Sequence, residues 1–83
     1  MRVHDALRKA FTRFNAYADP FTLMELETFV LSAVKDGKDS TAARSLIDNV
    51  RSILVRSEDP DPENRAKAIV EYVLRLCDGG CTP

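Results

Sequence analysis

The 83 residues are enough for one hydrophobic core and too few for two, so we expect a single domain over residues 1–83. Apolar residues make up 45% and charged residues 30% of the chain, a balance typical of folded globular proteins. The net charge of −1 gives no overall attraction to nucleic acid or anionic lipid, and no apolar run approaches the roughly 20 residues of a membrane-spanning helix.

The first predicted helix covers residues 2–17. Its apolar residues recur at spacings of three and four, the period of one buried helical face: Val3, Leu7, Ala10, Phe11, Phe14 and Ala18. Asp19-Pro20 then ends the helix, because proline disfavours the helical conformation in the residue before it. Charged residues interrupt the apolar ones here, so the segment lacks the apolar core of a signal peptide, and we expect a cytoplasmic protein.

The second predicted helix covers residues 23–36 and has the clearest start signal. Thr22 and Glu25 have the spacing of a capping box, in which each side chain bonds the other residue's backbone amide. Phe21 and Leu26 are placed for a hydrophobic staple across this start. Gly37 is suited to the backbone conformation that ends a helix.

The third and fourth predicted helices cover residues 40–56 and 62–78. Either Asp39 or Ser40 can cap the third helix, and either Asp-Pro step of residues 59–62 can begin the fourth. Gly79-Gly80 ends the fourth helix, which leaves residues 79–83 as a flexible tail.

These segments predict an all-α fold, a small up-down four-helix bundle-like domain with short loops. Short connections place sequential helices antiparallel to each other. The net charges of the four segments also alternate in sign, starting with a positive first segment. In a cyclic bundle each segment would then lie beside two segments of opposite charge, which favours this arrangement by a few tenths of a kcal/mol per exposed pair.

The sequence offers little that could carry catalysis. His4 has no identifiable nucleophile or orienting carboxylate nearby, and no glycine-rich phosphate loop is present. A zinc site would need two ligands beyond Cys77 and Cys81, and we expect instead a core Cys77 beside a tail Cys81. The loop of residues 16–23 has one carboxylate and does not fit a calcium site. We therefore predict no enzyme, no catalytic residues, no metal, no cofactor and no small-molecule substrate.

A DNA-binding helix-turn-helix regulator over residues 23–51 is the alternative function. Its reading surface would consist of Ser40, Thr41, Arg44, Asp48 and Arg51. Asp39 and Asp48 lie on or near that surface, and the chain has no basic stripe, both of which argue against nucleic acid as a partner.

The favoured function is a small helical protein–protein interaction module: a regulator, adaptor, inhibitor or immunity-type protein. Several apolar residues exceed what the predicted core needs, on the outer sides of the second and fourth helices. We predict an interface for a protein partner or a homodimer that consists of Met24, Leu31, Ile69, Tyr72 and Leu76.

Overall fold

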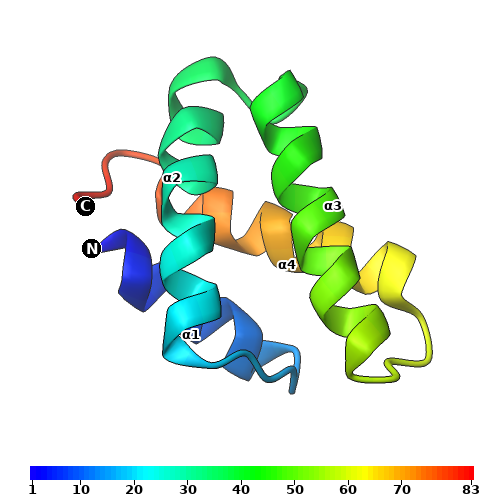
Figure 1. Ribbon diagram of the computed structural model, residues 1–83. Coiled ribbons are helices and arrows are strands. Elements are labelled where there is room, and N and C mark those ends of the chain that lie inside the picture. Colours follow the sequence, from blue (N-terminus) through cyan, green and yellow to red (C-terminus); the bar gives the residue numbers. More distant parts are fainter.

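The structure, a computed structural model, describes all 83 residues and contains four α-helices (Figure 1). They are α1 (Val3–Arg13), α2 (Pro20–Asp36), α3 (Thr41–Arg56) and α4 (Pro62–Leu76). A single bridge between Arg2 and Thr82 is the one extended pairing. The predicted all-α fold is therefore confirmed.

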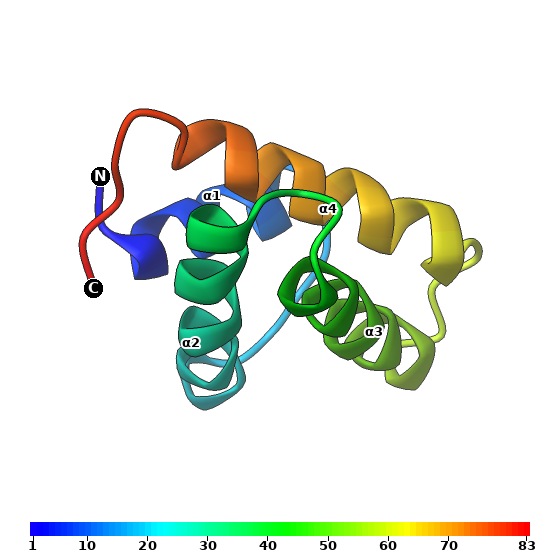
Figure 2. The same cartoon turned by 90° about the horizontal axis from the view of Figure 1, so that it is seen from above.

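Each helix packs against its neighbours in the sequence, and α4 returns to pack against α1. Figure 1 shows α2 and α3 side by side and running in opposite directions, with α4 crossing behind α3. Figure 2 shows α1 and α4 together on one side of this pair. The connectivity is that of the expected up-down four-helix bundle.

The charge alternation holds for three of the four helices. Between the observed bounds, α1 and α3 carry a net positive charge and α2 a net negative charge. However, α4 itself carries three basic and two acidic residues, because the other acids of its segment lie in the flanking loops: Glu58, Asp59, Asp61 and Asp78. Attraction between helix charges therefore does not explain why α4 packs on α1.

The core consists of 19 buried residues, all of them apolar or cysteine, from all four helices and the residue that ends α4. No polar or charged residue is buried. Helix α4 contacts each of the other three helices, as α2 does, so its surface is covered from more than two sides. The largest side chains that are fully buried are Leu7, Leu46, Leu54 and Ile69.

Helix α1 ends at Arg13, earlier than its apolar periodicity predicts. Asn15 adopts a left-handed conformation with φ of 55°, which turns the chain out of the helix. The guanidinium of Arg65 donates to the Phe14 carbonyl, and its Nε donates to Asp59 Oδ2 at 2.8 Å. Arg65 thus ties the end of α1 to the loop that precedes α4.

The predicted capping box of α2 is wrong. The helix begins at Pro20, and Asp19 Oδ1 accepts a hydrogen bond from the Thr22 amide at 2.9 Å. Asp19 thus bonds the Thr22 amide that Glu25 would have bonded in the capping box. The Glu25 amide needs no cap, because a helix that begins at Pro20 leaves only its first four residues without an intrahelical acceptor. Phe21 is 78% exposed, so the predicted staple is absent as well.

Ser40, and not Asp39, caps α3. Its Oγ accepts from the Ala43 amide at 3.1 Å and donates to the Gly37 carbonyl at 2.6 Å. Gly37 ends α2 with φ of 104°, a backbone conformation that residues other than glycine rarely adopt. One serine therefore joins the end of α2 to the start of α3.

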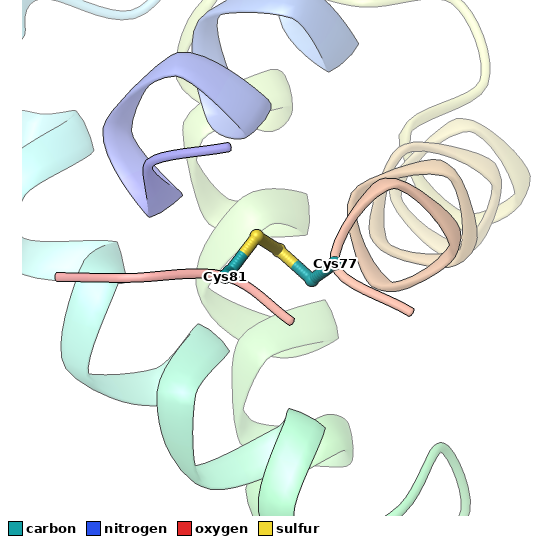
Figure 3. The surroundings of a disulfide bond; sticks show 2 residues. All are labelled: Cys77 and Cys81. Atoms are coloured by element: carbon teal, nitrogen blue, oxygen red, sulfur yellow. A yellow bond between two sulfur atoms is a disulfide. The ribbon is translucent and has the colours of Figure 1, made fainter. Parts of the chain in front are cut away.

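The predicted flexible tail is wrong for most of residues 79–83. Cys81 forms a disulfide with Cys77, which is fully buried at the end of α4 (Figure 3). The Thr82 amide donates to the Met1 carbonyl at 3.1 Å, and the Val3 amide donates to the Thr82 carbonyl at 2.8 Å. The disulfide ties this segment to the end of α4. The two backbone hydrogen bonds hold it against the start of α1.

None of the four helices combines the length and the apolar character needed to cross a membrane.

Candidate interaction surface

The five residues predicted as an interface do not form one exposed surface. Met24 is 58% exposed, as expected, but Ile69 is completely buried and belongs to the core. Leu31, Tyr72 and Leu76 are partly buried and pack against the core. The expectation for Ile69 is wrong because α4 contacts three helices, and these contacts use the wide apolar arc that appeared to be in excess.

Tyr72 also has an intramolecular partner. Its ring lies edge-to-face against Phe14, with the ring centroids 6.1 Å apart. Aromatic pairs favour this geometry, in which the positive edge of one ring meets the negative face of the other. Tyr72 therefore packs α4 against the residue that ends α1.

Exposed apolar side chains gather where α1 connects to α2. Tyr17 is 75% exposed and Phe21 78%, and Met24 lies one turn after Phe21 on the same side of α2. We call Tyr17, Phe21 and Met24 the aromatic patch. The remaining exposed large apolar residues lie apart along the sequence: Met1, Val34 and Val55.

The sequence does contain a signal for this patch, in the cap of α2. With Thr22 as the cap of a helix over residues 23–36, Phe21 precedes the cap and is placed for a staple. Once Asp19 is recognised as the cap, Phe21 becomes the second residue of the helix, where it faces away from the buried Leu23 and Leu26. The choice of cap thus decided whether an aromatic residue was placed inside or outside.

A hollow of about 370 Å³ lies between α1 and α2, and Tyr17 is the one residue of the aromatic patch that lines it. Its lining includes the buried Phe11 and Leu23, the exposed Tyr17, and Arg8. Neither of the two ion pairs in the structure involves Arg8, so its charge is available on this face. The hollow is thus an apolar depression with an aromatic and a cationic side chain in its wall.

His4, in the wall of the same hollow, has a carboxylate partner that the sequence did not predict. Its Nδ1 lies 3.3 Å from Glu27 Oε2, with both side chains partly exposed. No hydroxyl or thiol is hydrogen-bonded to either residue, so the pair lacks a nucleophile. Its evident role is to join α1 to α2.

The residues of the alternative DNA-reading surface differ in exposure and in the contacts they make. Ser40 is used as the cap of α3, while Thr41, Arg44 and Asp48 are exposed and Arg51 is partly buried. The pair formed by α2 and α3 runs side by side in Figure 1, whereas the helices of a helix-turn-helix cross at a large angle. The arrangement adds nothing in favour of DNA binding.

The titratable groups form no cluster of three or more histidine, cysteine, aspartate or glutamate side chains that could hold a metal ion. The only clear shift in acidity belongs to Asp19. The hydrogen bond from the Thr22 amide, followed by the Thr22 side chain and the Phe21 amide, lowers the pKa of Asp19. This shift reflects helix capping and not a reactive site.

Comparison with known proteins found no matching family model, no similar curated protein and no similar solved structure.

Proposed function

We propose that the protein is a helical protein–protein interaction module that docks through the aromatic patch and the adjoining hollow. The observation that carries the proposal is the exposure of Tyr17 and Phe21, both above 70%, beside Met24. Aromatic side chains and methionine are enriched in the centres of protein interfaces. Aromatic rings offer a large contact area with only two side-chain torsions to fix, and the flexible methionine side chain adapts to irregular surfaces. Under this proposal the protein acts in the cytoplasm and is neither an enzyme nor a cofactor carrier.

The partner that we propose is a second copy of this chain. A two-fold interface must be self-complementary. The segment between α1 and α2 carries the exposed Tyr17 in the wall of the hollow, and the exposed Phe21 follows at the start of α2, so one copy can offer a ring and the other a depression to receive it. The wall of the depression carries Arg8, while Glu25 is exposed on the α2 side of the patch. Two copies that exchange Phe21 rings would bring the cation of one copy toward the acid of the other.

A dimer of standard size would cover a modest part of the surface. A standard interface covers about 800 Å² of each partner, and the total accessible surface here is 5334 Å². Each aromatic side chain contributes about 150–250 Å² when it is fully buried. Tyr17, Phe21 and Met24 can therefore supply the centre of the interface, and neighbouring polar residues can supply its rim.

Sedimentation velocity at micromolar concentration tests the proposal. We expect a dimer for the unaltered protein and a monomer for Phe21→Asp, which places a charge at the centre of the interface without touching the core. Val34→Asp is the matched control, because Val34 is 39% exposed on the same helix and about 20 Å further along it.

A dimer that survives Phe21→Asp, or one that Val34→Asp disrupts equally, would contradict the proposed surface. A monomer at all concentrations would exclude the second copy as the partner. If the protein binds a different protein and Phe21→Asp abolishes that binding, the proposed surface is correct and the partner is not a second copy. Helical circular dichroism of each variant verifies that the fold is intact.

A further inference from the structure

The start of α1 lacks the side-chain cap that α2 and α3 possess. Arg2 occupies the capping position, and no side chain there accepts a hydrogen bond from the first-turn amides. The Val3 amide donates instead to the Thr82 carbonyl at 2.8 Å. A residue 79 positions away in the sequence thus satisfies one of the amides that a helix leaves unpaired at its start.

The disulfide is what places Thr82 there. Cys81 directly precedes Thr82 and is bonded to Cys77, which is fully buried where α4 ends. Gly79 and Gly80, between the cysteines, have φ of 96° and 126°, so the connecting turn uses conformations that only glycine adopts without strain. The bond therefore fixes the position of Thr82 relative to the end of α4, and Thr82 in turn meets the start of α1.

We propose that Cys77 and Cys81 form a thiol–disulfide switch that controls the capping of α1. In the oxidised protein the Thr82 carbonyl caps α1. In the reduced protein residues 79–83 lose their covalent anchor, and the Val3 amide and the Met1 carbonyl lose their partners. Val3 is the first buried residue of α1, so release of the segment also loosens the outermost layer of the core. The switch is independent of the aromatic patch.

The reductant in this proposal is a dithiol. Its first thiolate attacks the sulfur of Cys81, the partly exposed member of the pair, and Cys77 leaves as a thiolate that takes up a proton. The second thiolate of the reductant then attacks the mixed disulfide and releases Cys81. Two electrons and two protons pass to the protein, and the reductant becomes a cyclic disulfide. In the cytoplasm such bonds are usually transient and serve as redox sensors.

Amide hydrogen exchange followed by NMR tests the switch. The oxidised protein is compared with the same protein after treatment with dithiothreitol, and mass spectrometry verifies the gain of two hydrogens. We expect the amides of Val3 and Ala6 to exchange at least about tenfold faster after reduction, since local opening governs their protection. Amides in the middle of α2 and α3 should change far less.

Cys81→Ser is the control, because it lacks the bond in either condition. Its Val3 and Ala6 amides should exchange fast with and without dithiothreitol, which separates loss of the bond from other effects of the reagent. Two outcomes with the unaltered protein overturn the proposal: reduction that leaves exchange at Val3 and Ala6 unchanged, and a disulfide that excess dithiothreitol does not reduce in the folded protein.

Discussion

Ile69 and Phe21 offer the sharpest test of which apolar residues form the core. Replacing Ile69 with Ala removes three carbon atoms from a completely buried side chain. At about 0.8 kcal/mol per buried carbon the lost transfer free energy is about 2.4 kcal/mol, and the unfilled cavity raises the total to about 2–5 kcal/mol. A domain of this size is stable by about 4–12 kcal/mol, so Ile69→Ala should remove a large part of its free energy of unfolding.

Phe21→Ala removes more atoms from a side chain that is 78% exposed. Its effect on the free energy of unfolding of the monomer should stay within about 0.5 kcal/mol. Urea unfolding followed by circular dichroism measures both variants, at a protein concentration low enough that association does not add stability. A cost below about 1 kcal/mol for Ile69→Ala, or a larger cost for Phe21→Ala than for Ile69→Ala, would refute the assignment of Ile69 to the core.

Three further predictions concern the polar contacts that fix the helix ends. Arg65→Met should lower the free energy of unfolding by about 1–3 kcal/mol in urea titrations. The substitution removes the partner of the Asp59 carboxylate, whose side chain is only 9% exposed. An unchanged midpoint would mean that the protein does not need this ion pair. Ser40→Ala should cost about 1 kcal/mol and more than Thr22→Ala, and the reverse order in thermal melts would restore the capping box at Thr22. Hydrogen bonds from the start of α2 lower the pKa of Asp19 in the folded protein. The Asp19 carboxylate therefore stabilises the folded state fully above about pH 4, and this stabilisation is lost as the pH falls through the lowered pKa. Asp19→Asn should therefore flatten the acid side of the stability–pH curve, and identical curves would argue against the cap.

Helical periodicity predicted the existence and order of all four helices, because a buried face needs apolar residues at fixed spacing whatever the partner helix is. Helix ends were harder to predict. Asp19-Pro20 was interpreted as a stop for the first helix when it is the start of the second, and a proline after a capping residue is compatible with both. That single choice also placed Phe21 inside the fold.

The surface could not be predicted in the same way, because exposure depends on how many neighbours a helix has. Ile69 and Tyr72 exceed the needs of a helix with two neighbours, but α4 has three. The segment beyond Gly80 was predicted as flexible for a related reason. The Met1 and Val3 backbone groups that bond Thr82 come from the opposite end of the chain and leave no local pattern in the sequence. Cys77 lies only four residues from Cys81, but this spacing does not tell a bonded pair from two free thiols.

The most direct test of the proposed docking surface is a search for contacts between copies by NMR. Isotope-labelled and unlabelled protein are mixed, and nuclear Overhauser effects are recorded only between the two. We predict contacts from the Phe21 ring of one copy to Phe11 and Leu23, in the hollow of the other, at concentrations where sedimentation shows a dimer. Contacts between copies that involve Tyr72 and Leu76 instead, with no contact from Phe21, would contradict the proposal.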